Sequence, residues 1–153
     1  MPERKKLDAL TGIRFFAAFH VLAFHCWPWR DYRGIGAQAA GSGFIGVSLF
    51  FVLSGFIFGY NYFGREVVPK RFFRDRFARV YPVYALALLV ALPAFLRSFG
   101  TANLPVYVLT RATLTQAWFP TIVLEWDTPA WSLAVEAFFY LLFPLIAIPI
   151  QRI

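Results

Sequence analysis

The stretch ALTGIRFFAAFHVLAFHCWPW, residues 9–29, decides the fold. Its length matches the roughly 20 apolar residues that an α-helix needs to cross a bilayer. Within it, only Arg14 and the two histidines, His20 and His25, carry a charge at or near neutral pH. We therefore expect a transmembrane helix that holds ionisable side chains inside the membrane.

Arg14 and His25 are eleven residues apart, which on an α-helix is about 20° beyond three full turns and about 16 Å along the axis. They therefore share one helix face. An ionisable residue inside a membrane helix indicates a pathway or a reactive site. We interpret His25 as a general base and Arg14 as the holder of an anionic group. The alternative is that both residues serve as interfacial anchors. His20 lies about 140° from His25 around the helix, and we interpret it as structural.

The composition is that of a membrane protein. The 153 residues are 59% hydrophobic and 15% charged, with 19 phenylalanines, whereas a soluble domain carries about 25% charged residues. We expect an all-α, polytopic transmembrane bundle with about four or five membrane segments. The net charge of +7 does not indicate nucleic-acid binding, because the basic residues lie between apolar runs, as in cytoplasmic loops.

Apolar runs predict four spans, at about 9–29, 43–63, 80–97 and 129–150. Residues 98–124 contain prolines and an arginine and have no unbroken apolar run of span length. They either cross as an extra span or form a re-entrant segment that returns to the side from which it entered. We favour the return, because it places Arg152 in the cytoplasm and Glu136 near the outer face, level with His25.

Basic residues set the orientation. They gather at the N-terminus (Arg4, Lys5 and Lys6) and between the second and third spans (Arg65, Lys70, Arg71, Arg74, Arg76 and Arg79), whereas the loop after the first span has only Arg30 and Arg33. The positive-inside rule places the first two groups in the cytoplasm. His25 then lies near the outer end of its span and Arg14 near the inner end.

The basic cluster of residues 70–79 has two interpretations. Its positive charges are opposed only by Asp75. They either follow the positive-inside rule and contact anionic lipids, or they bind a phosphate-rich ligand, since the arginine fork matches phosphate oxygens.

Glu136 lies inside the last apolar run, where a carboxylate is costly to keep. It either pairs with an arginine of another span or orients an imidazole or a substrate hydroxyl. In the second case it would favour the imidazolium form of His25 and hold the tautomer of its ring. Gly55 and Gly59, four residues apart in the second span, predict close helix packing.

Four blocks of the chain carry a family resemblance. They are Leu7 to His25, with arginine and histidine separated by ten residues; Gly43 to Phe56 (GFIGVSLFFVLSGF); Arg71 to Pro82; and Trp131 to Glu136 (WSLAVE). In this order they resemble the acyltransferase family 3 membrane proteins, which include bacterial O-acetylases of polysaccharides. Ser48 stands where that family usually has aspartate, and Ala137 and Phe138 stand where it often has glutamate and glutamine.

The resemblance implies that residues 1–153 are the N-terminal part of one membrane-embedded acyltransferase domain, inactive on its own, in the bacterial inner membrane. It implies transfer of an acyl group, commonly acetyl, from acetyl-CoA or another acyl-CoA to a hydroxyl of a carbohydrate or lipid-linked glycan. His25 and Glu136 would be catalytic. The donor would be bound by Arg14 and by four arginines of the basic cluster (Arg71, Arg74, Arg76 and Arg79). We expect no metal and no permanently bound cofactor. The competing class is a non-catalytic translocator of a glycan or lipid.

Overall fold

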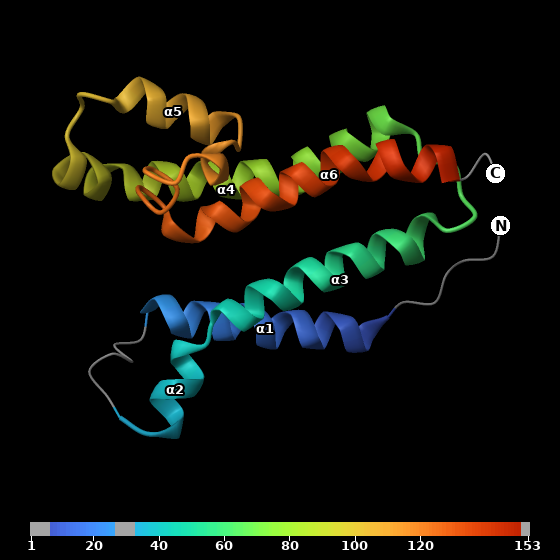
Figure 1. Cartoon of the computed structure of the whole chain (residues 1–153), viewed down its shortest axis with the longest axis horizontal. Helices are drawn as coiled ribbons and strands as arrows, with labels where there is room; N and C mark the ends of the chain where they lie inside the picture. The colour runs from blue at the N-terminus through green and yellow to red at the C-terminus, as the bar shows by residue number, and fades with distance from the viewer. Residues whose placement is uncertain (1–6, 27–32, 151–153) are drawn as a thin grey trace. The chain divides into compact units, whose positions relative to one another are not determined.

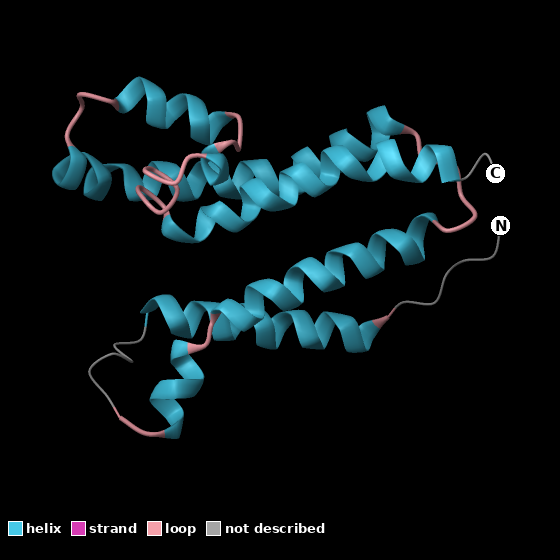
Figure 2. Ribbon diagram, viewed as in Figure 1, coloured by secondary structure: helices cyan, strands magenta, loops and turns pink. Residues whose placement is uncertain are grey.

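The structure is a computed structural model that describes residues 7–26 and 33–150. The chain divides into two compact units, Met1–Arg65 and Glu66–Ile153, and each is described by itself. Every regular element in the described ranges is helical (Figure 2). The all-α fold predicted from the sequence is confirmed.

Four helices of the described residues are long and apolar enough to cross a membrane. Their candidate spans are Ala9–Cys26, Phe44–Tyr62, Pro69–Phe99 and Thr128–Ile150. They correspond to the four spans expected from hydropathy. The end of the first expected span, at residues 27–29, lies outside the described residues, as do the N-terminal basic residues and Arg152.

The first unit contains α1 (Asp8–Cys26), α2 (Ile35–Gly41) and α3 (Phe44–Tyr62) (Figure 1). Glycines bring α1 and α3 together. A Cβ atom added at Gly46 would lie 2.9 Å from the carbonyl oxygen of Ala17, and one at Gly43 would lie 2.2 Å from Cβ of Phe24. The close approach expected at Gly55 and Gly59 is absent, because a Cβ atom there would meet nothing within 4 Å among the described residues.

His20 joins α1 to α2. Its Nε2 lies 2.6 Å from the carbonyl oxygen of Ala39, at the end of α2. Because a carbonyl oxygen can only accept, Nε2 carries the proton and donates it. Ser42 donates its hydroxyl to the same carbonyl oxygen at 2.8 Å. The structural role predicted for His20 agrees with this contact.

The second unit is built on α4, which runs without interruption from Pro69 to Phe99 over 31 residues, about 46 Å at the usual rise. The sequence analysis placed the third span at 80–97 and the basic residues in a loop, and this was wrong at its start. Proline fits the first turn of a helix, and lysine and arginine are good helix formers. The helix therefore begins eleven residues before the apolar run that hydropathy detects.

We call residues 104–130 the return segment; it contains α5 (Leu104–Ala112) and two short 3-10 helices, η2 (Gln116–Trp118) and η3 (Thr128–Ala130). The chain leaves α4 at Gly100, whose φ of 69° suits glycine. α5 then runs back along α4 (Figure 1). The hydroxyl of Tyr84 donates to the carbonyl oxygen of Arg111 at 3.1 Å, and that of Tyr81 to Ala112 at 3.1 Å.

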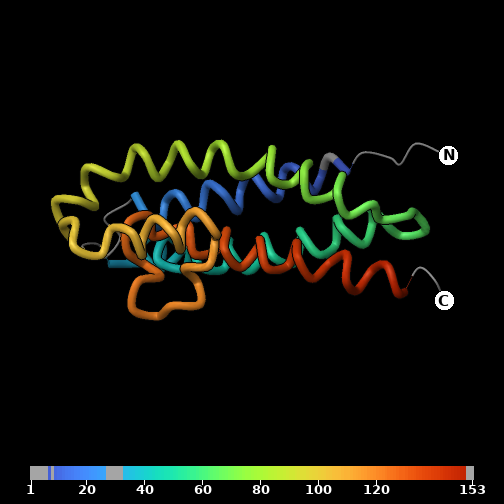
Figure 3. The backbone as a smooth tube through the Cα atoms, turned by 90° about the horizontal axis from the view of Figure 1, so that it is seen from above, coloured from blue at the N-terminus to red at the C-terminus, as the bar shows by residue number. Residues whose placement is uncertain are grey.

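The last helix, α6 (Trp131–Ile150), packs antiparallel to α4 (Figures 1 and 3). The ring of Phe143 stacks on that of Phe72 at 5.4 Å, and the ring of Tyr140 meets Phe72 edge-on at 6.3 Å. The beginning of α4 and the end of α6 therefore lie at the same end of this unit. This is the arrangement that a returning segment 98–124 requires; its position relative to a bilayer stays a prediction.

Candidate functional site

His25 lies in the last turn of α1 and is exposed. Its Nδ1 is 2.8 Å from the carbonyl oxygen of Val21, one turn earlier in the same helix. The carbonyl can only accept, so Nδ1 carries the proton and, in the neutral ring, Nε2 keeps a lone pair. The ring of Phe24 meets the imidazole edge-on at 5.0 Å. This tautomer is the one that can accept a proton or attack an acyl group through Nε2.

Arg14 lies on the same helix, three turns before His25. Its Nε atom is buried and has no hydrogen-bond partner in the described part of the protein. Buried polar atoms are nearly always paired. Such an atom on the helix that carries His25 fits the anion-holding role predicted for Arg14, and that role stays a prediction.

The arginines of α4 fall into two groups. Arg71 and Arg74 are exposed and pair with Asp75, with N–O distances of 3.8 and 3.0 Å. Pairs this exposed stabilise the fold by less than about 1 kcal/mol, so both guanidinium groups can exchange Asp75 for another anion at little cost.

Arg76 and Arg79 form the second group. Arg76 lies over the Phe72 ring, with its guanidinium carbon 5.6 Å from the ring centroid. Both Arg76 and Arg79 act electrostatically on the hydroxyl of Tyr140 in α6. The structure therefore separates the predicted donor-binding arginines into a pair that contacts Asp75 and a pair near α6, in which Arg76 is half-buried and Arg79 is exposed.

Glu136 accepts a hydrogen bond from the hydroxyl of Tyr140, at 2.5 Å to its Oε1 atom. The two residues are one helical turn apart on α6. Since Arg76 and Arg79 influence that same hydroxyl, Glu136 lies toward the basic end of α4. In the structure α6 begins beside the middle of α4. The sequence analysis expected Glu136 near the outer face of the membrane, level with His25, and this depth stays a prediction.

The predicted partnership of His25 with Glu136 joins two units that are described separately, and it stays a prediction. One part of it needs correction. The carbonyl oxygen of Val21 holds the tautomer of His25, the task that the sequence analysis gave to Glu136. Any contribution of Glu136 to the chemistry would therefore be electrostatic, or would act on a substrate group.

Arg111 is the most buried cation of the described residues, with 1% of its surface exposed. It donates to two backbone carbonyl oxygens of the return segment, at 2.7 Å to Ile122 and 2.5 Å to Glu125. Its guanidinium also lies over the ring of Tyr107, 5.5 Å from the centroid. Tyr107 in turn donates to the carboxylate of Glu125. That hydrogen bond, followed by burial, raises the pKa of Tyr107, and burial lowers the pKa of Arg111.

Two further side chains hold the return segment against α4. Gln116, fully buried, donates from Nε2 to the carbonyl oxygen of Ala130 at 3.1 Å and to the hydroxyl of Tyr84 at 3.4 Å. Trp126 donates its indole N–H to the carbonyl oxygen of Leu88 at 3.0 Å. The sequence analysis treated Arg111 only as an interruption of an apolar run. The available signal was the one used for Arg14, a lone cation in an apolar segment.

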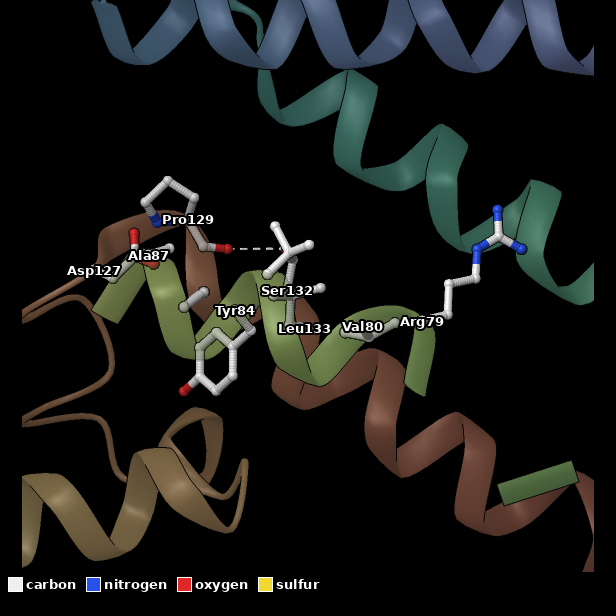
Figure 4. A pocket seen from close by; sticks show the side chains of 10 residues that line it. Arg79, Val80, Tyr84, Ala87, Asp127, Pro129, Ser132 and Leu133 are labelled. Carbon is white, nitrogen blue, oxygen red and sulfur yellow. Dashed lines mark hydrogen bonds between the residues drawn. The ribbon is translucent and has the colours of Figure 1, made fainter. Parts of the chain in front are cut away.

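A pocket of about 420 Å³ lies between α4 and the start of α6 (Figure 4). Most of its wall is apolar and includes Val80, Val83, Ala87 and Leu133. The aromatic ring of Tyr84 also lines it, while the hydroxyl of that residue is hydrogen-bonded to the carbonyl oxygen of Arg111. The lining of the pocket therefore suits a mainly apolar ligand.

Polar groups mark the two ends of this pocket. In Figure 4, Arg79 lies at the right and extends away from the other lining side chains, and Asp127 lies at the left beyond Ala87. Ser132 also lines the pocket and donates its hydroxyl to the carbonyl oxygen of Pro129 at 2.9 Å. The pocket thus has a cation at one end and a carboxylate at the other (Figure 4).

Fold and site together define a polytopic α-helical membrane protein in which α1 carries Arg14 and His25 and α4 begins with a basic cluster. Comparison with known proteins identifies its family. A family model described as an acyltransferase domain matches residues 7–153. The chain therefore belongs to the acyltransferase family 3 membrane proteins, as its four sequence blocks indicated.

Three relatives illustrate the similarity. Acyltransferase MdmB of Streptomyces mycarofaciens is 36% identical over 161 residues, which cover 95% of this chain and 40% of the relative. Protein 2 in the picA locus of Rhizobium radiobacter is 37% identical over 91 residues, covering 57% and 44%. O-acetyltransferase OatA of Staphylococcus aureus is 28% identical over 156 residues, covering 92% and 24%. The chain thus spans less than half the length of each of these relatives. No solved structure matches it.

Proposed function

We propose that the protein is an integral membrane O-acyltransferase that moves an acyl group, typically acetyl, from acyl-CoA to a hydroxyl of a carbohydrate or lipid-linked glycan. The observation that carries this proposal is the match of residues 7–153 to the acyltransferase family. The names of two relatives, an acyltransferase and an O-acetyltransferase, support it. The exposed His25 with a free Nε2 lone pair supplies a base of the required kind.

The reaction breaks the C–S bond of the thioester and forms a C–O bond to the acceptor. As a general base, His25 takes the proton of the acceptor hydroxyl on Nε2, and the thiolate of CoA leaves with the electron pair of the C–S bond. The imidazolium then returns the proton to give the free thiol. In the alternative route, Nε2 is itself acylated and the acceptor hydroxyl attacks in a second step. The Nδ1–H bond to Val21 supports either route.

The donor would approach from the cytoplasm, with the N-terminus on that side of the bacterial inner membrane. Its phosphates would meet the basic start of α4, where Arg71 and Arg74 are exposed and pair with Asp75. Arg14 would hold an anionic group deeper in the protein.

The test is replacement of His25 in the protein at its full natural length, reconstituted in lipid. His25→Ala should lower acetyl transfer about 10²–10⁴-fold, measured as release of CoA thiol that depends on acceptor. His20→Gln is the matched control and should retain most of the activity, since the amide can still donate to Ala39. Normal transfer by His25→Ala would refute the role of His25. A wild-type protein that never consumes acetyl-CoA, yet moves a glycan across the bilayer, would instead establish a translocator.

A further inference from the structure

We propose that the pocket between α4 and the start of α6 binds the thioester-bearing arm of the acyl donor, which enters beside Arg79. This inference rests on the proposed function and adds a binding site to it. Three features of the pocket support it: the charges of Arg79 and Asp127 at its ends, its apolar walls, and the hydrogen bonds that hold one wall in place.

The charges fix the orientation of a ligand. Arg79 extends from the pocket near Arg76, so an anionic group is favoured at that end. At the other end Asp127 disfavours a second anion, but its carboxylate can accept a hydrogen bond from an amide N–H. A ligand with phosphates at one end and an uncharged, amide-containing arm matches this pattern, and the arm of CoA has that chemistry.

The walls distinguish the arm from a sugar. Val80, Val83 and Ala87 of α4 face Leu133 of α6 across the pocket. A carbohydrate needs a hydrogen-bond partner for most of its hydroxyls, and leaving them unpaired costs about 1–3 kcal/mol each. These side chains offer no such partners, whereas a thin aliphatic arm loses little on entering. The acceptor is therefore expected elsewhere.

The wall that carries Asp127 is held in place from both sides. Arg111 holds the carbonyl oxygens of Ile122 and Glu125, and Gln116 holds that of Ala130. Between them Trp126 adopts a φ of 69°, which is uncommon for a bulky residue. Its ring stacks on Phe95 at 4.7 Å. A wall fixed in this way is preorganised, so a ligand does not need to order it on binding.

The test compares two ligands on variants of the full-length protein in neutral lipid. Acetyl-CoA carries both the phosphates and the arm, whereas adenosine 3′,5′-bisphosphate carries phosphates without the arm. Ala87→Phe fills the pocket and should weaken acetyl-CoA binding at least about tenfold, while bisphosphate binding stays unchanged. Ala94→Phe is the matched control, because position 94 lies two helical turns further on nearly the same face of α4 and does not line the pocket. It should leave both affinities unchanged.

Leu133→Trp fills the pocket from α6 and should give the same selective loss as Ala87→Phe. If both pocket variants bound acetyl-CoA with wild-type affinity, the proposal would be overturned and the pocket would be a lipid contact. Equal loss of both ligands in both variants would also overturn it, because the effect would not depend on the arm. If the wild-type protein binds neither ligand, the proposed function itself fails, and this result is distinct from the other two.

Discussion

At the scale of single residues, His25 shows how a helix can fix the tautomer of a histidine side chain. The ring Nδ1 of a helical histidine can reach the carbonyl oxygen four residues earlier, which has two lone pairs and can accept this bond in addition to the helical N–H. In α1 this carbonyl belongs to Val21, and the bond fixes the proton on Nδ1. No carboxylate is needed to select the tautomer of His25. This separates the role of His25 from that of Glu136, which lies in another unit and is hydrogen-bonded to Tyr140.

Gly46 gives a prediction at the same scale. Its missing Cβ atom allows α3 to approach the backbone of Ala17 in α1, the helix that carries His25. Gly46→Ala should push the two helices apart and lower the free energy of unfolding by about 1–3 kcal/mol, measured by unfolding in detergent.

Gly55→Ala, on the same helix, is the control for Gly46→Ala. An added Cβ atom meets nothing within 4 Å there among the described residues, so the substitution should stabilise α3 slightly or be neutral, since alanine is favoured over glycine in a helix by up to about 1 kcal/mol. Equal effects of the two substitutions would contradict the close approach at Gly46.

At the scale of elements, the return segment shows how irregular backbone is stabilised beside apolar helices. Its turns leave carbonyl oxygens without helical partners, and such groups are costly where water is scarce. The guanidinium of Arg111 satisfies two of them and the amide of Gln116 satisfies a third. Both side chains are almost completely buried. The polar residues that interrupt the apolar pattern of the sequence therefore make up the interior of this segment.

Arg111→Met gives the prediction for this element. It keeps a long apolar side chain but removes the charged donors from the carbonyl oxygens of Ile122 and Glu125, so that Ile122 keeps only the backbone N–H of Glu125, at 3.2 Å. The free energy of unfolding should fall by about 2–5 kcal/mol, measured by thermal or denaturant unfolding. Arg97→Met, an exposed position in the last turn of α4, should change stability by less than about 0.5 kcal/mol. If Arg111→Met were as stable as the wild-type protein, the hydrogen bonds of the Arg111 guanidinium would not be needed for the stability of the fold.

At the scale of the whole molecule, the antiparallel packing of α4 and α6 determines the expected topology. α4 is long enough to cross a bilayer by itself. α5, with nine residues, is too short to cross back. If α4 crosses, the chain makes its next crossing in α6. The basic start of α4 and the end of α6 should then face the cytoplasm together.

Cysteine labelling tests this topology in a full-length protein in which Cys26, the single cysteine of residues 1–153, and any cysteine outside these residues are first replaced by serine. Thr101→Cys, in the connection between α4 and α5, should react with an impermeant reagent added outside the cell. Glu66→Cys and Ile150→Cys, at the other end of the second unit, should react only when the reagent reaches the cytoplasm. Labelling of Ile150→Cys from outside, together with Thr101→Cys, would mean that the return segment crosses the membrane.

The features that depend on periodicity and hydropathy could be predicted from the sequence. It predicted the all-α class, the four spans and the continuous helix that carries Arg14 and His25, because burying a helix in lipid requires a long apolar run whatever its neighbours are. Its four blocks also indicated the family. For the same reason it misplaced the start of α4: hydropathy measures apolar length, whereas a helix can continue through charged residues.

Which groups contact each other follows from the tertiary packing. Glu136 accepts a hydrogen bond from Tyr140 near the basic end of α4, and the carbonyl oxygen of Val21 fixes the tautomer of His25. The close approach of α3 to α1 occurs at Gly46 and not at Gly55 or Gly59. The structure also shows that the buried Arg111 holds the backbone of the return segment through two hydrogen bonds. These contacts depend on how far one helix slides along another and on where a short segment turns back. Hydropathy along the chain carries no information about that register, because many registers bury the same apolar surface.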